Sequence, residues 1–243
     1  MVMVVAPHLR RFVLLGLPSS GKGTYGQLLS KKFGVPLISV SSLLKEAFNG
    51  ASNQLIQAAG KQRMLDGDLV EDRVVDKLVH SEVARLRANG EYGYILDGYP
   101  RTMPQYDEVM RWDRLMSPQL SIFLDVPEWV IREKMNGRRV CECCGKAWNV
   151  VAIKRDGWDL PEMLHNKQSK FCKCGGKLKD RLDDMSNKSI SNRIRAYESS
   201  TMGVIRAFRK SGTLIAWRPF KGVQGVTELY NLIEGSAGSL GQP

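Results

Sequence analysis

Short apolar runs alternate with longer amphipathic segments along most of the chain. The apolar runs predict buried strands at 11–15, 35–39, 94–97, 120–126 and 213–217. The amphipathic segments predict helices at 21–33, 43–49, 54–66, 72–89, 189–210 and 226–233, with one further helix after each of the strands at 94–97 and 120–126. Strands that alternate with helices are typical of an α/β fold with a mainly parallel sheet.

Two stretches do not follow this alternation. Residues 141–180 have little periodicity and many Gly, Lys and Cys residues, which predicts an inserted, loop-rich module. Residues 235–243 are mostly small and polar, so we expect a frayed tail.

Composition is ordinary for a globular protein, with 43% apolar and 25% charged residues in 243. No window reaches the roughly 18 apolar residues of a membrane span. The first apolar run ends at Gly16 without a small-residue cleavage site, which disfavours a secretory signal. We therefore expect an intracellular protein without a membrane partner, in the cytoplasm or alternatively in the mitochondrial matrix or another organelle.

The net charge of +11 is unevenly distributed. Between Gly137 and Arg181 there are eleven Lys and Arg residues against five Asp and Glu residues. Such a surplus suits a flap that closes over phosphates, and it also suits a surface that binds RNA. Charge alone does not decide between the two.

A glycine-rich segment, Gly16-Leu-Pro-Ser-Ser-Gly-Lys-Gly-Thr24, lies between the first predicted strand and helix. In this context, backbone N–H groups and the helix N-terminus can surround a phosphate. Lys22 is then placed to reach the β- and γ-phosphates. The alternative is a glycine-rich turn without a ligand, which the flanking strand and helix disfavour.

A second motif, Leu96-Asp-Gly-Tyr-Pro-Arg-Thr-Met-Pro-Gln105, follows the third predicted strand. Asp97 ends that strand, where ligands of open α/β sheets gather. The Arg101 guanidinium can hold a phosphate through two hydrogen bonds, and the Gln105 amide can donate to and accept from a base edge. The alternative is a proline-rich turn with an exposed arginine.

Together the two motifs resemble the adenylate kinase family, which transfers a phosphoryl group from ATP to AMP with Mg²⁺. The resemblance implies a three-layer P-loop NTPase-type α/β fold with a central parallel five-stranded sheet. It further implies a core of 9–39, 70–136 and 182–235, an AMP-binding helical arm at 40–69, a lid at 137–181 and a tail at 236–243.

The resemblance also implies roles for individual residues. The catalytic set is Lys22, Arg101, Arg138, Arg181 and Arg193, and Asp97 would hold Mg²⁺ through water. The donor ATP would contact Gly16, Pro18, Ser19, Ser20, Gly21, Lys22, Gly23, Thr24, Lys134 and Arg138. The acceptor AMP would contact Val40, Lys45, Asp68, Leu69, Val70, Gly98, Arg101, Gln105, Arg181 and Arg193.

Several positions depart from the family pattern, among them Val40, Ser41 and Ser42, where the family usually has Thr-Gly-Asp. Ser19 and Lys45 replace a usual glycine and arginine, and Lys134 replaces the arginine that stacks on the donor adenine. These changes leave other readings open: GTP as donor, another monophosphate as acceptor, or a low-activity nucleotide-binding protein whose basic insert contacts nucleic acid. We expect a monomer that binds ATP and AMP and does not bind nucleic acid.

All five cysteines lie in the basic insert, as Cys141-Glu-Cys-Cys144 and Cys172-Lys-Cys174. Two such pairs in an intracellular protein are typical of a structural zinc site with four sulfur ligands. The ligands would be Cys141, Cys144, Cys172 and Cys174, with Cys143 spare or substituting. The alternative is a lid that carries free thiols.

Overall fold

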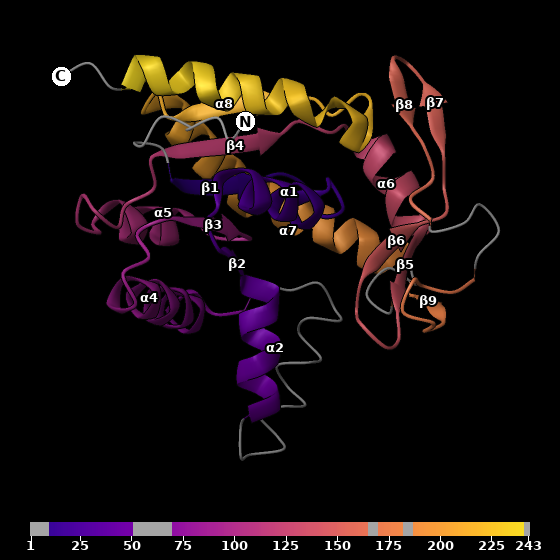
Figure 1. Cartoon of the computed structure of the whole chain (residues 1–243), viewed down its shortest axis with the longest axis horizontal. Coiled ribbons are helices and arrows are strands. Elements are labelled where there is room, and N and C mark those ends of the chain that lie inside the picture. The colour runs from indigo at the N-terminus through magenta and orange to yellow at the C-terminus, as the bar shows by residue number, and fades with distance from the viewer. Residues whose placement is uncertain (1–9, 51–69, 165–169, 182–186, 241–243) are drawn as a thin grey trace.

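The computed structural model describes residues 10–50, 70–164, 170–181 and 187–240. At its centre is a parallel sheet of five strands in the order β10-β4-β1-β3-β2 (Figure 1). The strands are β1 (Arg11–Leu15), β2 (Leu37–Ser39), β3 (Tyr94–Asp97), β4 (Leu120–Leu124) and β10 (Leu214–Trp217). This confirms the fold class predicted from the sequence.

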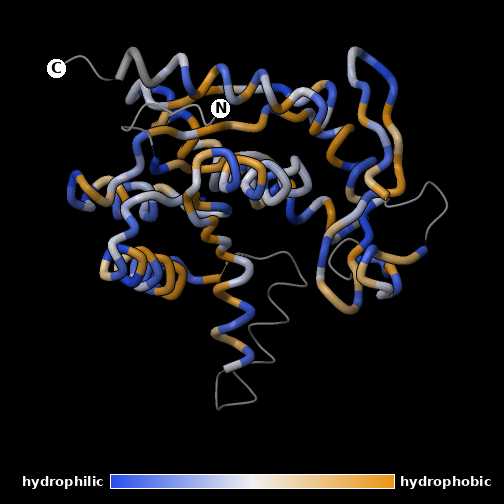
Figure 2. The backbone as a smooth tube through the Cα atoms, in the orientation of Figure 1, coloured by the Kyte–Doolittle hydropathy of each residue, from blue (hydrophilic) through white to orange (hydrophobic). Residues whose placement is uncertain are grey.

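Alternate residues of β1 belong to two different cores, one on each face of the sheet. Phe12 and Leu14 pack with α1 (Lys22–Phe33), α6 (Glu128–Asn136) and α8 (Val226–Leu240). Val13 and Leu15 pack with α4 (Asp72–Ala88), α5 (Met103–Met110) and the end of α7 (Asn187–Lys210). Because helices cover both faces of the sheet, most residues of the central strands are apolar. Figure 2 shows the central strands as mainly hydrophobic.

Helix α2 (Val40–Gly50) extends away from the sheet and begins the segment predicted as the acceptor arm (Figure 1). It starts three residues before the predicted helix, directly after β2. The predicted helix at 54–66 lies outside the described residues.

The insert is richer in strands than the sequence suggested. Strands β5 (Arg138–Cys141), β6 (Ala147–Asn149) and β9 (Leu178–Asp180) form one antiparallel sheet, and β7 (Ile153–Arg155) and β8 (Trp158–Leu160) form a hairpin. The prediction of a loop-rich module holds for most of the described residues of the insert, but it missed these strands. Its missed signal was Asp156-Gly157, both with positive φ, a dipeptide that favours a two-residue hairpin turn.

The β7–β8 hairpin is attached to the core. Ile153 and Trp158 are buried in the same cluster as β1 and α8. The Trp158 ring lies 4.9 Å from that of Phe220, and the Asp159 amide donates to the Phe220 carbonyl at 2.7 Å. In Figure 1 the hairpin stands beside α6, apart from β9.

The expectation of a frayed tail was wrong as far as Leu240, because α8 continues to that residue. Ile233 is buried, and the neighbouring Glu234 pairs with Lys32 at 3.0 Å. The Ser236 hydroxyl donates to the Leu232 carbonyl within the same helix. These contacts keep a segment of low intrinsic helix propensity helical. None of the helices in the described residues is long and apolar enough to cross a membrane.

Candidate active site

The glycine-rich segment connects β1 to α1, as the sequence predicted. Gly21 caps α1 with φ 105°, a conformation that favours glycine. The Lys22 ammonium donates to the carbonyls of Gly16 at 2.7 Å and Leu17 at 3.0 Å. Ser20 is fully buried, and its hydroxyl lies 2.7 Å from where a Cβ on Gly16 would be. The loop therefore folds back over the helix N-terminus, the geometry of an anion site.

Ser19 has φ 65°, in the left-handed region. The family resemblance implies a glycine at this position, and a residue other than glycine is strained at this φ.

Replacing Ser19 by glycine is expected to raise the free energy of unfolding by about 1 kcal/mol, because the relieved strain exceeds the added chain entropy. Urea denaturation measures the change. The control is Ser199→Gly, an exposed position within α7 that should lose stability. A loss of stability in Ser19→Gly would show that the loop carries no such strain.

Four charged groups act on Lys22 at the carboxyl ends of the strands. The pKa of Lys22 is lowered to about 7, mainly by burial. The carboxylate of Asp97 raises this pKa, whereas the charges of Arg101, Arg193 and Arg138 lower it. The Asp97 carboxylate also lies 3.7 Å from where a Cβ on Gly23 would be. These residues come from the glycine-rich segment, β3, the loop after β3, β5 and α7, and the fold brings them to one place.

The loop that carries Arg101 is held by a polar network. The Gln105 side chain accepts from the Arg101 amide at 2.7 Å and donates to Asp72 at 2.8 Å. The Thr102 hydroxyl donates to the same carboxylate at 2.6 Å. An amide group has two donors and two lone pairs, so these two contacts use one donor and one lone pair of the Gln105 amide.

Asp72 and Thr102 were not predicted as site residues. Thr102 caps α5 and accepts from the Gln105 amide at 3.3 Å, while Gln105 occupies the third helical position. This Thr-x-x-Gln spacing is a capping-box pattern and was readable in the sequence. Asp72 gave no such signal, because it lies 30 residues from Thr102.

Of the other residues predicted to contact AMP, Val40 and Gly98 lie next to each other in the structure. The side chain of Val40, the first residue of α2, lies 3.6 Å from where a Cβ on Gly98 would be. Val70 is half-buried and packs on the α4 side of the sheet. Lys45 is exposed on α2. Asp68 and Leu69 lie outside the described residues.

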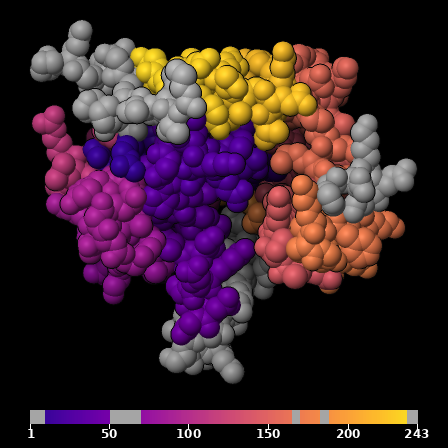
Figure 3. Space-filling view, in the orientation of Figure 1, coloured from indigo at the N-terminus to yellow at the C-terminus, as the bar shows by residue number. Residues whose placement is uncertain are grey.

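The remaining predicted arginines lie at the two ends of the predicted lid and on α7. Arg138 begins β5, and Arg181 directly follows its neighbour β9. Arg193 is half-buried on α7, whereas Arg195 is exposed, as expected from their spacing. One turn after Arg193, the buried Tyr197 hydroxyl lies near the Gly16 backbone, where burial raises its pKa. In Figure 3 the surface is indented between α2 and the lid strands.

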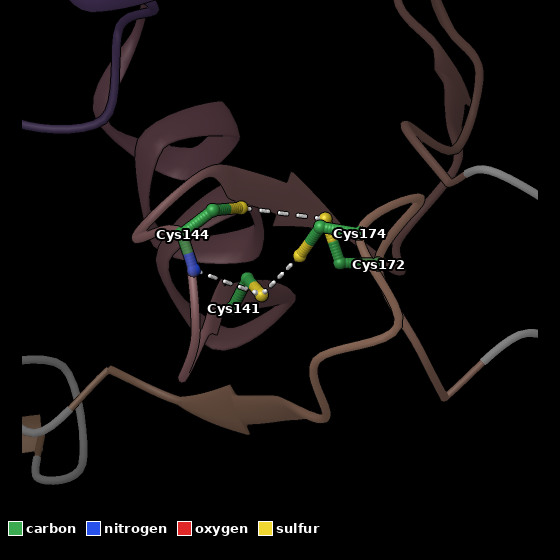
Figure 4. Close-up of side chains that lie close together, drawn as sticks. All are labelled: Cys141, Cys144, Cys172 and Cys174. Carbon is green, nitrogen blue, oxygen red and sulfur yellow. Dashed lines mark hydrogen bonds between the residues drawn. The ribbon is translucent and has the colours of Figure 1, made fainter.

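The four predicted ligand cysteines converge in the lid (Figure 4). Their sulfur atoms all lie within 4.8 Å of one another. Cys141 and Cys174 are 3.4 Å apart, and Cys144 and Cys172 are 3.6 Å apart. Sulfurs about 2.3 Å from a tetrahedral zinc ion stand about 3.8 Å from each other, so the cluster fits zinc. Cys143 lies outside this group of four and is exposed.

The lid has a small apolar core of its own. Trp148 packs with Cys141 and Cys172, supported by Leu164 and Leu178. So few apolar side chains stabilise a small module weakly, and modules of this kind commonly depend on a metal or disulfides.

This arrangement, a phosphate loop facing a group of arginines at the switch point of a parallel sheet, defines a P-loop nucleotide-binding protein. The family model for adenylate kinase matches residues 14–213. A GTP:AMP phosphotransferase of Plasmodium falciparum (isolate 3D7) is 31% identical over 224 residues, 92% of this chain and 95% of the relative. An adenylate kinase of Nitrosococcus oceani is 36% identical over 209 residues, 84% of this chain and 88% of the relative.

An adenylate kinase of Thermodesulfovibrio yellowstonii is 34% identical over 226 residues, 92% of this chain and 96% of the relative. The chain therefore belongs to the adenylate kinase family, and it is a phosphotransferase. The resemblance inferred from the two sequence motifs is confirmed.

Proposed function

We propose that the protein transfers the γ-phosphoryl group of Mg·ATP to AMP, giving two ADP, and that the reaction is reversible. The observation that supports this most directly is the placement of Arg101, Arg138, Arg193 and Asp97 close enough to Lys22 for their charges to act on it. Cations drawn from separate elements into one site suit a substrate pair that is rich in phosphate.

In this mechanism an oxygen of the AMP phosphate attacks the γ-phosphorus, and the bond from that phosphorus to the β–γ bridging oxygen breaks. The acceptor is already an anion at neutral pH, so no strong general base is needed. Lys22 and the arginines align the two phosphate chains and neutralise the charge that develops on the transferred group. Arg138 begins β5 and Arg181 directly follows β9, both in the predicted lid, so closure of the lid would add these arginines to the site while excluding water.

Asp97 suits the role of holding Mg²⁺ through water, since carboxylate oxygens are preferred ligands and this one lies beside the glycine-rich loop. When bound with the donor, Mg²⁺ neutralises charge on the phosphates. Gln105, Val40, Lys45, Asp68, Leu69 and Val70 are proposed to contact AMP.

The donor base is the least constrained part of the proposal. A GTP:AMP phosphotransferase among the relatives makes GTP the alternative donor. To decide, purified protein is incubated with Mg²⁺, ATP or GTP, and each of AMP, GMP, CMP and UMP, and diphosphates are measured. The proposal expects AMP to be the best acceptor and ATP the better donor. Faster turnover with GTP would establish the alternative, and no diphosphate with any pair would contradict the assigned reaction.

We further propose that Cys141, Cys144, Cys172 and Cys174 hold one structural zinc ion. Four thiolates would leave no open position for catalysis, so zinc would act by holding the lid together. We also propose that the protein acts as a cytoplasmic monomer.

Replacing Cys172 by serine is expected to remove bound zinc and lower the thermal midpoint, because this buried sulfur belongs to the cluster. Metal analysis and thermal unfolding measure both effects. Cys143→Ser is the matched control, and it should keep one zinc per chain. Zinc-free parent protein after expression with zinc, or equal loss in both variants, would contradict the assignment.

A further inference from the structure

Lys134 lies on the last turn of α6, where family resemblance places an arginine that stacks on the donor base. The structure places its ammonium beside the glycine-rich loop. Its nitrogen is 3.8 Å from where a Cβ on Gly21 would be, and Gly21 is the N-cap of α1. The ammonium therefore lies at the helix N-terminus where Lys22 begins the phosphate site.

Neighbouring segments hold the end of α6 in this position. The Asn149 side chain donates to the Lys134 carbonyl at 2.8 Å, and the Val150 amide donates to the carbonyl of Gly137, the C-cap of α6, at 2.9 Å. At the other end of the helix, Arg155 of the hairpin lies over the Trp129 ring at 4.1 Å. The backbone that carries Lys134 is thus fixed on both sides.

The surroundings of this ammonium favour an anion. In the part of the chain that the structure describes, Lys134 has no ion pair with a carboxylate. Its pKa is lowered to about 8, mainly by burial and in addition by the charge of Arg138. A desolvated cation beside another cation and a helix N-terminus is stabilised when an anion binds between them.

We propose that Lys134 binds a phosphate of the donor nucleotide, together with Lys22, and does not stack on the donor base. This rests on the proposed function of the glycine-rich loop as the donor site. An ammonium is a point charge and a poor planar partner, so its chemistry agrees with its position. One consequence is that residue 134 contributes nothing to the choice between ATP and GTP.

The test uses a donor without a base. Parent protein and Lys134→Met are titrated by calorimetry with inorganic tripolyphosphate, ATP and GTP. The proposal expects Lys134→Met to weaken all three by a similar factor, about tenfold or more, as for loss of one charge-assisted hydrogen bond. Lys154→Met, an exposed lysine of the hairpin, controls for the loss of net charge. Weaker binding of ATP and GTP with unchanged tripolyphosphate binding, or no change at all, would overturn the proposal.

A second variant keeps the test decisive if Lys134→Met unfolds. Lys134→Arg retains the charge, so its affinity for tripolyphosphate should stay within about threefold of the parent's. Its affinity for ATP should not increase by a larger factor than its affinity for tripolyphosphate. A higher affinity of Lys134→Arg for ATP and GTP, without a higher affinity for tripolyphosphate, would instead show that residue 134 contacts the donor base. Failure of the parent itself to bind any triphosphate would refute the donor site as a whole, which is distinguishable from failure of this inference.

Discussion

Replacing Lys22 by methionine is expected to lower kcat at least about 100-fold, because the ammonium that stabilises the transferred group is lost. A coupled assay of ADP formation with ATP and AMP measures the change. Lys31→Met is the matched control, since it removes an exposed lysine from the same helix and should leave kcat within about twofold. Near-parental kcat in Lys22→Met would show that this side chain does not act in the reaction.

The same substitution has a second expected effect, on stability. The pKa of Lys22 is 10.5 in its ordinary state and about 7 in the folded, ligand-free protein. The unfolded chain therefore binds a proton at this site between pH 7 and 10.5 that the folded chain does not. The charged group destabilises the folded state fully below pH 7, and this penalty fades as the pH rises.

Lys22→Met removes that penalty, so the variant should be more stable than the parent by the largest margin near pH 6. Urea denaturation from pH 6 to pH 9 measures the margin, which is expected to shrink as the pH rises. A margin that grows with pH would mean that Lys22 is not held in a desolvated state. Loss of activity together with a gain of stability is typical of residues placed for catalysis.

Replacing Arg101 by alanine is expected to lower kcat/KM for AMP at least about 100-fold, because a guanidinium held beside Asp97 and Arg193 would be lost. Burial and the nearby Arg193 lower the pKa of this group, while Asp97 raises it. Holding the charged guanidinium there therefore costs folding free energy, which a bound phosphate would offset. Initial rates at varied AMP with ATP saturating measure the loss.

Arg101→Lys refines that test, since lysine keeps the charge and loses the two-pronged geometry, and its activity should lie between alanine and the parent. Arg111→Ala, exposed at the end of α5, is the control and should leave kcat/KM unchanged. Equal loss in Arg101→Ala and Arg111→Ala would point to α5 folding, and not to phosphate binding, as the cause.

The sequence predicted those parts of the site that are continuous in the chain. The glycine-rich segment is read directly, because its strand, loop and helix follow one another. The segment from Asp97 to Gln105 is likewise continuous in the chain. Within it, the Gln105 side chain at the start of α5 accepts a hydrogen bond from the Arg101 amide in the preceding loop.

Contacts between distant segments were not predictable in this way. Asp72 begins α4 and looks like an ordinary helix-start carboxylate until the fold places it against Thr102 and Gln105. The docking of the hairpin on Phe220 joins the lid insert to the turn before α8, and neither segment carries a periodic pattern that indicates the other.

Lys134 shows a different limit. Alignment with a family pattern assigns a residue by its place in the chain, but the reach of its side chain depends on what packs around α6. Here Asn149 and Gly137 fix the end of the helix, and the ammonium lies at Gly21. The position of the ammonium beside Gly21 could therefore be learned only from the structure.

The central claim is that one site holds a donor and an acceptor phosphate chain end to end. A compound of two adenosines joined through five phosphates spans both positions and tests this directly by calorimetry. The account predicts one molecule bound per chain, at least about 100-fold more tightly than ATP, and much weaker binding to Lys22→Met and Arg101→Ala. Binding no tighter than ATP, or tight binding unaffected by Arg101→Ala, would contradict it.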